Sequence, residues 1–318
     1  MKYYIGVDIG GTKCAVTVGA MGADGQLDIL DKRRYDTQGT PYEMLEKLCV
    51  GIAEITQDKK PEAIGVSCGG PLDSKRGLIL SPPNLPGWDA VPVKQILEEK
   101  FGVPCRLQND ADACALAEWK FGAGRGTEHM IFLTCGTGFG AGLILNGRLY
   151  SGSCDMAGEI GHIRVTDTGP VGYGKAGSFE GFCSGGGIAQ VARTAAMEQL
   201  QMGKRCVFCG SWAELDAITA KTVADAANAG DELALGVYRT CGTYLGRSLA
   251  LLIDLLNPQA IVLGSIYARC ENLLRQICLD VIEKECLALA AKKCRILPAQ
   301  LGERIGDIAA LAVAAQEV

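Results

Sequence analysis

The fold is decided by the stretch Tyr3-Tyr-Ile-Gly-Val-Asp-Ile-Gly-Gly-Thr-Lys-Cys-Ala-Val-Thr-Val18. Aromatic and β-branched residues at positions 3–7 and 14–18 predict two strands, and the glycines between them predict the tight turn of a hairpin. Because glycine has no Cβ, the backbone of such a turn can approach a phosphate group closely. We therefore expect a hairpin whose turn, residues 8–13, is a candidate phosphate-binding loop.

A second glycine turn, at residues 134–142, lies between strands expected at 130–134 and 143–145. It is followed by apolar strand-like sequence rather than by a helix, which argues against a dinucleotide-binding motif, and the chain contains no P-loop pattern. Hydrophobic periodicity predicts further strands at 26–35, 63–67, 105–107 and 260–263, and helices at 41–57, 91–101, 111–120 and over most of 188–256. The pattern predicts two α/β halves, each opened by a glycine hairpin.

The composition is that of a globular protein, with 318 residues, 48% hydrophobic and 21% charged. This length suits about two domains. The net charge is −5 without a basic block, so we expect no nucleic-acid partner. We identify no signal peptide and no membrane span, so we expect no membrane partner and a cytoplasmic location. The 15 cysteines are expected to be reduced and mostly buried, and the single C-x-x-C, Cys206 to Cys209, lacks the further ligands of a zinc site.

Several motifs together resemble the ROK family of bacterial sugar kinases and repressors. They are Asp8-Ile-Gly-Gly-Thr-Lys13, Asn109-Asp110, Thr134-Cys-Gly-Thr-Gly138, Ala157-Gly-Glu-Ile-Gly-His162 and Leu256-Asn-Pro-Gln-Ala-Ile-Val-Leu-Gly264. The resemblance implies an α/β fold, the two-lobed actin-like ATPase (ribonuclease H-like) fold, with the active site in the interdomain cleft. It also implies an N-terminal domain over 1–110, a C-terminal domain over 111–303, and a C-terminal helix at about 304–318 that packs back on the first domain.

The resemblance implies ATP-dependent phosphorylation of a hexose or N-acetylhexosamine hydroxyl, at O6, with Asp110 as the general base. From the residues alone two roles fit Asp110, a base beside the substrate or a helix N-cap. A helix N-terminus is expected to lower the pKa of this carboxyl. The family match assigns sugar binding to Gly69, Asn84, Asn109, Glu159, His162 and Glu180, whose amide and carboxylate members suit sugar hydroxyls.

The expected cofactors are ATP and Mg²⁺, and the resemblance distributes their contacts over both glycine turns. Two roles fit Asp8, capping the turn after a strand or ordering a water on Mg²⁺ that arrives with ATP, and the resemblance implies the second. Gly264 is the expected adenosine contact, although Ser265 stands where the family often has a second glycine. Phosphate binding is assigned to Gly10, Gly11, Thr12, Lys13, Gly136, Thr137 and Gly138.

Many ROK proteins hold a structural zinc ion with three cysteines and a histidine. In this chain Val171, Tyr173 and Ser178 occupy the three cysteine positions, so we predict no zinc, since His162 cannot hold the ion alone. The loop over 169–187 must then be held in another way, and packing by Tyr173 and Phe179 is our expectation.

The resemblance implies a homodimer whose partners are a sugar and ATP. A different class of function stays open, that of a sugar-binding regulator of the same family without kinase activity, similar to the ROK repressors. Those repressors carry a DNA-binding helix-turn-helix before the first glycine hairpin, which here starts at Tyr3. The Asn109-Asp110 pair favours the kinase over a catalytically inactive sensor.

Overall fold

The computed structural model of the protein describes residues 1–57, 59–136 and 138–316. Its contacts divide the chain into two compact units. Unit 1 comprises Met1–Phe132, Gly142–Ala157 and Gln300–Val318, and unit 2 comprises Leu133–Ala141 and Gly158–Ala299. These contacts group residues 111–132 with the N-terminal strands, whereas the sequence analysis begins a second domain at residue 111. The domain boundaries expected from the sequence stay a prediction.

Unit 1 is built around a five-stranded sheet of order β3-β2-β1-β4-β7, in which β1, β2 and β3 are antiparallel and β4 and β7 run parallel to β1. The first glycine turn joins β1 to β2, as predicted. The elements of this unit are β1 (Lys2–Ile9), β2 (Lys13–Met21), β3 (Leu27–Asp36), α1 (Pro41–Thr56), β4 (Ala63–Cys68), β5 (Leu72–Asp73), β6 (Leu78–Ile79), α2 (Val93–Phe101), β7 (Cys105–Asn109), α3 (Asp110–Phe121), β10 (Arg148–Leu149) and α11 (Ile305–Ala314).

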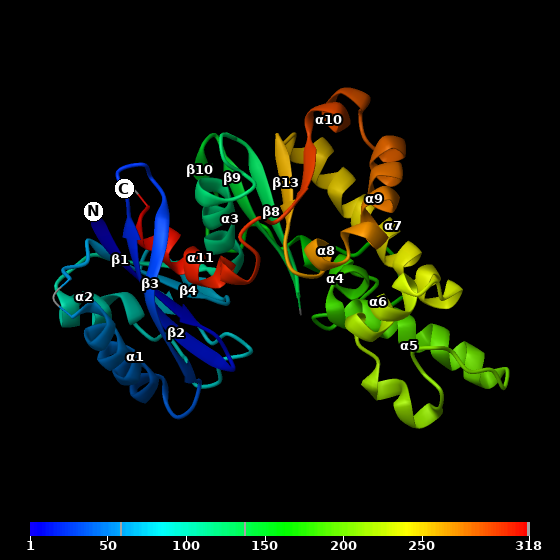
Figure 1. Cartoon of the computed structure of the whole chain (residues 1–318), viewed down its shortest axis with the longest axis horizontal. Coiled ribbons are helices and arrows are strands. Elements are labelled where there is room, and N and C mark those ends of the chain that lie inside the picture. Colours follow the sequence, from blue (N-terminus) through cyan, green and yellow to red (C-terminus); the bar gives the residue numbers. More distant parts are fainter. Residues whose placement is uncertain (58, 137, 317–318) are drawn as a thin grey trace. The chain divides into compact units, whose positions relative to one another are not determined.

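The two faces of this sheet carry different residues because side chains alternate along a strand. Ile5, Val7 and Ile9 of β1 belong to a core that includes the apolar stripe of α1 and Leu97 of α2. On the opposite face, the intervening residues of β1 include Gly6 and Asp8. Helix α11 packs on β1, β4 and α3 there (Figure 1), and a Cβ on Gly6 would lie 2.9 Å from the Cβ of Ala310. The C-terminal helix expected from the sequence is thus present over 305–314 and packs within unit 1.

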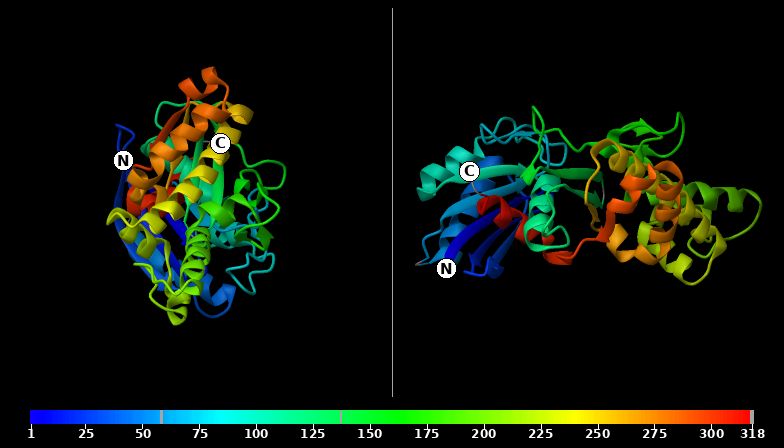
Figure 2. Two further views of the ribbon diagram at one scale, coloured as in Figure 1. Left: turned by 90° about the vertical axis from the view of Figure 1, so that its right-hand side faces the viewer. Right: turned by 90° about the horizontal axis from the view of Figure 1, so that it is seen from above.

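The second sheet has the order β10-β9-β8-β13-β14, and the unit boundary falls inside β8 and β9. In unit 2, the long helices α7 and α9 pack side by side (Figure 2). The remaining elements are β8 (Met130–Cys135), β9 (Phe139–Leu145), η1 (Ile160–His162), β11 (Val171–Gly172), β12 (Lys175–Ala176), α4 (Phe179–Cys183), α5 (Gly185–Gln201), η2 (Trp212–Ala217), α6 (Ala220–Asn228), α7 (Glu232–Leu256), β13 (Ala260–Leu263), α8 (Ile266–Arg269), α9 (Glu271–Glu285), α10 (Ala288–Lys293), β14 (Arg295–Pro298) and, in unit 1, η3 (Gly302–Arg304).

The strands and helices predicted from periodicity are confirmed, with ends that move by a few residues. The second glycine turn is shorter than expected, because β9 already starts at Phe139. Ten of the fifteen cysteines are buried and all are free thiols, and burial raises the pKa of Cys105 and of Cys241 to about 12. Cys206 and Cys209 form a tight hairpin in which each backbone N–H donates to the carbonyl of the other.

No helix in the part of the chain that the structure describes is both long and apolar enough to cross a bilayer.

Candidate active site

In unit 1, Asp110 is the first residue of α3, directly after β7. Asn109 is the helix N-cap, and its Oδ1 accepts the N–H of Ala111 at 2.9 Å. Asp110 Oδ1 accepts the same N–H at 2.7 Å. The N-cap role that the sequence left open for Asp110 therefore belongs to Asn109. The Oδ1 of Asn109 is used by this hydrogen bond, and its Nδ2 lies toward Gly70, where it would be 3.3 Å from a Cβ on that glycine.

The expectation of a lowered pKa for Asp110 is wrong in direction. Desolvation by the surrounding protein raises its pKa and outweighs the backbone hydrogen bonds at the helix N-terminus, which lower it. The residue as a whole is nevertheless exposed to solvent. Because its pKa is raised, the Asp110 carboxylate is a stronger base than an ordinary aspartate, and because the residue is exposed, a substrate can reach it. Both properties suit a group that accepts a proton from a substrate.

Gly69, Asn84 and Asp110 converge in unit 1. A Cβ on Gly69 would lie 3.7 Å from both side-chain atoms of the Asn84 amide and 4.0 Å from Asp110 Oδ2. The loop that carries Asn84 also packs on the first glycine turn, since a Cβ on Gly11 would lie 2.8 Å from the Cβ of Asn84. Gly11 is thus required by the protein's own backbone, in addition to any ligand.

The first glycine turn is closed by its own hydrogen bonds. The N–H of Gly10 donates to the carbonyl of Lys13 at 3.1 Å, and the Thr37 hydroxyl donates to the carbonyl of Gly10 at 2.7 Å. Thr12 and Lys13 are exposed. The turn is held rigidly while its tip stays accessible.

Asp8 lies among three other charged groups of unit 1. Its pKa is raised to about 6, mainly by burial and then by the negative charges of Asp110 and Asp307, whereas Lys32 lowers it. Lys32 also forms an ion pair with Asp307 in the first turn of α11. Since three carboxylates face one ammonium group, the cluster has an excess of negative charge that a divalent cation would relieve.

In unit 2, the second glycine turn is tied to α4 and α5. Phe139 N–H donates to the Glu180 carboxylate at 3.1 Å, and the N–H of Gly185 donates to the carbonyl of Gly136 at 2.8 Å. A Cβ on Gly138 would lie 3.1 Å from Glu180 Oε2. Glu180 therefore adjoins this turn directly. Thr137, which the sequence analysis assigns to phosphate binding, lies outside the described residues.

Glu159 directly precedes η1 and His162 is its last residue, and both are exposed. A Cβ on Gly158 would collide with the carbonyl of Ala141 in β9, and a Cβ on Gly161 would collide with the carbonyl of Phe139. The glycines let η1 lie directly on the strand, and His162 is not a core histidine.

The loop between His162 and Glu180 is held differently from expectation. Phe179 is buried, but Tyr173 is 72% exposed. Tyr173 has a φ of +44° at the tip of the β11–β12 hairpin, and its ring lies edge-on to that of His162, with 6.0 Å between the ring centroids. The packing expected of Tyr173 is therefore limited to this contact at the surface of the loop. Among the described residues, no group of three or more His, Cys, Asp and Glu side chains is placed to hold a metal ion.

A cavity of about 880 Å³ in unit 2 begins at Gly136, which makes it a candidate nucleoside pocket. This size is in the range of small-molecule sites. Gly264 lies at the end of β13, where its N–H donates to the carbonyl of Leu133, and the next residue, Ser265, has a φ of +52°. Ser265 therefore has the left-handed backbone conformation that a glycine would adopt without strain. The lining is Gly136, Gly185, Gly186, Ala189, Ile218, Thr219, Ala220, Lys221, Ala224, Asp225, Asn228, Tyr238, Ile266, Arg269 and Cys270.

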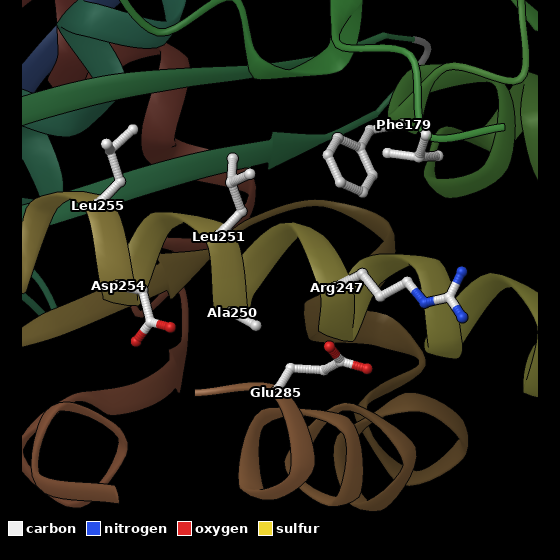
Figure 3. Close-up of a pocket in the computed structure, with 8 residues that line it drawn as sticks. Phe179, Arg247, Ala250, Leu251, Asp254, Leu255 and Glu285 are labelled. Atoms are coloured by element: carbon white, nitrogen blue, oxygen red, sulfur yellow. The ribbon is translucent and has the colours of Figure 1, made fainter. Parts of the chain in front are cut away.

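Sequence reasoning missed almost all of this lining, because its members come from several helices that are far apart in the chain and form no local motif. A second cavity of about 590 Å³ contains none of the predicted site residues (Figure 3). It lies along the last turns of α7, with Leu251 and Leu255 on its apolar side and Arg247 and Glu285 among its charged residues. It offers no glycine-lined backbone, so we do not assign the nucleotide to it.

Comparisons with known proteins agree with these observations. A solved structure of a ROK family glucokinase from Streptomyces griseus, in complex with glucose and AMPPNP, is 31% identical, with a TM-score of 0.76, and the match covers 99% of this chain and 100% of that one. The fold class is therefore confirmed as α/β, the actin-like ATPase fold of sugar kinases. The sequence profile of the ROK family matches residues 4–317, and the chain belongs to the ROK family.

Two curated relatives represent the two activities found in this family. The glucokinase of Streptomyces coelicolor is 30% identical over 316 residues, which are 98% of this chain and 96% of that protein. The N-acetylglucosamine repressor of Escherichia coli O6:H1 is 36% identical over 214 residues, which are 67% of this chain and 50% of the repressor. The glucokinase is thus matched over nearly its whole length and the repressor over half.

Proposed function

We propose that this protein is an ATP-dependent sugar kinase that transfers the γ-phosphoryl group of ATP to a hexose or N-acetylhexosamine, at O6. The family membership and the full-length glucokinase relatives support the sugar kinase. The observation that carries the catalytic assignment is the convergence of Gly69, Asn84 and a solvent-accessible Asp110 whose pKa is raised.

Asp110 acts as the general base in this proposal. Its carboxylate accepts the proton of the sugar hydroxyl as that oxygen forms its bond to the γ-phosphorus and ADP leaves. The raised pKa makes the carboxylate a better proton acceptor, and its place at the start of α3 fixes the direction of its side chain. Asn84 and Asn109 orient the sugar through hydroxyl contacts, with Asn109 using its Nδ2, since its Oδ1 caps α3.

The glycine turns bind phosphate in this proposal, with Gly10 to Lys13 in unit 1 and Gly136 and Gly138 in unit 2. The N–H groups of Gly10 and Gly136 donate within the turns, to the carbonyls of Lys13 and Gly138, so the remaining backbone N–H groups and the exposed side chains of Thr12 and Lys13 bind the phosphate. In the cavity beside Gly136, apolar side chains such as Ile218 and Ile266 suit the faces of a purine base. Mg²⁺ bound to ATP would be held through water by Asp8, and it supplies neutralisation of phosphate charge. The negative charges of Asp110 and Asp307 near Asp8 support a cation that is held through water, since among the described residues no three such side chains are placed to hold a metal ion directly.

Glu180, Glu159 and His162 complete the sugar contacts in this proposal. Carboxylates and an imidazole can each bind a sugar hydroxyl. Glu180 already accepts the N–H of Phe139, which fixes one carboxylate oxygen and leaves the other for the sugar.

The direct test is ADP release from ATP over a panel of hexoses and N-acetylhexosamines, followed by location of the phosphate on the product. Sugar-dependent ADP release with a 6-phosphate product supports the proposal. Tight sugar binding without ADP release would favour the sugar-binding regulator instead, for which the repressor relative is the supporting observation.

Three further expectations also belong to this proposal: a homodimer, a cytoplasmic location and the absence of a nucleic-acid partner. Sedimentation of the purified protein tests the first, and a titration with duplex DNA tests the third.

A further inference from the structure

The β11–β12 hairpin, residues 171–176, touches two of the proposed sugar residues within unit 2. The Tyr173 ring lies edge-on to the His162 ring at 6.0 Å between centroids, and Lys175 Nζ donates to the carbonyl of His162 at 2.7 Å. On the other side, a Cβ on Gly172 would lie 2.7 Å from the Cβ of Glu180. The position of this hairpin therefore bears on both His162 and Glu180.

One side chain fixes the outer strand of the hairpin to a long helix. Gln190 of α5 accepts the N–H of Val171 with its Oε1 at 2.9 Å and donates from its Nε2 to the carbonyl of Val171 at 2.8 Å. The carboxamide thus pairs with the backbone of β11 as a neighbouring strand would. A pair of hydrogen bonds from one planar group fixes both position and orientation.

The backbone at the ends of the loop is paired as well. Phe179 N–H donates to the carbonyl of Ile163 at 3.0 Å, and Val165 N–H donates to that of Gly177 at 2.8 Å. These bonds close the base of the loop, whereas Gln190 holds its far end.

We propose that Gln190 is a positioning residue of the sugar site, whose carboxamide fixes the β11–β12 hairpin and through it His162 and Glu180. This inference rests on the proposed function, because it takes both residues to contact sugar. It predicts that loss of the two hydrogen bonds between Gln190 and Val171, which we call the Gln190 clamp, weakens sugar binding while the chemical step and nucleotide binding stay the same.

The test compares Gln190→Ala with Gln201→Ala, a substitution of an exposed glutamine at the end of the same helix. We expect Gln190→Ala to raise the KM for sugar about fivefold, with kcat and the KM for ATP changed less than twofold. Gln201→Ala should match the wild type. Gln190→Glu keeps the acceptor for the Val171 N–H and loses the donor to the Val171 carbonyl. Its KM for sugar should therefore lie between those of the wild type and Gln190→Ala.

A second readout needs no turnover. Amide hydrogen exchange over residues 171–178 should be faster in Gln190→Ala, with the rest of α5 unchanged. Unchanged exchange, or a sugar KM equal to that of the wild type, would overturn the clamp. Faster exchange in a protein that phosphorylates no sugar would contradict only the proposed function. In Gln190→Ala/His162→Ala, the two effects on sugar KM should not add, and full additivity would contradict an action through His162.

Discussion

Neutralising Asp8 should stabilise the protein at neutral pH, although it removes a residue of the proposed phosphate and Mg²⁺ site. The pKa of Asp8 is about 6 in the fold against an ordinary 3.8, which corresponds to about 3 kcal/mol of unfavourable free energy for the ionised carboxyl. The causes are burial and the charges of Asp110 and Asp307. Asp8→Asn removes this charge with little change in volume.

The sign of the pH dependence follows from the direction of the shift. Between about pH 4 and 6 the folded protein holds a proton on Asp8 that the unfolded chain has released. The protonated form favours the fold, so the contribution of Asp8 to stability is greatest below pH 4 and is lost as pH rises through about 6. Asp8→Asn should therefore unfold a few degrees higher than the wild type at pH 8 and at the same temperature at pH 4.

Thermal unfolding followed at pH 4, 6 and 8 measures the effect without nucleotide. Asp28→Asn, at an exposed position of β3, is the control and should leave the unfolding temperature unchanged at each pH. If Asp8→Asn raised the unfolding temperature equally at pH 4 and pH 8, or did not raise it at pH 8, the destabilisation assigned to the ionised Asp8 carboxyl would be refuted.

Three further predictions concern the scaffold. Gly65→Ala should destabilise the protein by about 2 kcal/mol or more, because its Cβ would collide with the carbonyl oxygen of Ala310 in α11. As the control, Gly236→Ala in α7 would place its Cβ at an ordinary contact distance of 3.8 Å from the Arg239 side chain, and it should be neutral or slightly stabilising in urea unfolding. Glu118→Ala should cost about 3 kcal/mol, since the buried carboxylate accepts three backbone N–H groups, one of them from Leu301; unfolding at an unchanged urea concentration would contradict this. EDTA should leave the unfolding temperature of the nucleotide-free protein unchanged, and elemental analysis that found one zinc per chain would contradict the predicted absence of zinc.

The sequence predicts the features that depend on local pattern. The alternation in residues 3–18 predicts β1, β2 and the turn between them, because a hairpin is specified by neighbouring residues. The spacing of Met44, Leu45, Leu48 and Ile52 likewise predicts α1, where Thr40 and Glu43 form the capping box.

The features that the sequence does not predict depend on residues far apart in the chain. The pKa of Asp110 follows from the desolvation of its carboxyl in the tertiary structure, which outweighs the helix N-terminus that the sequence reveals. The contacts of Gln190 with Val171 join residues 19 positions apart, and an isolated glutamine on a helix carries no signal of them. Tyr173 is exposed at a hairpin tip with a positive φ, a backbone conformation that its residue type does not favour.

The central claim is that Asp110 takes the proton from the sugar hydroxyl, and Asp110→Asn tests it most directly. The asparagine keeps the size of the side chain and an oxygen that can accept the N–H of Ala111, so the fold and both substrate affinities should persist. We predict that kcat for the best sugar falls by about 10²- to 10⁴-fold, while calorimetry gives sugar and nucleotide affinities within a few-fold of the wild type. Turnover close to the wild-type rate would contradict the account.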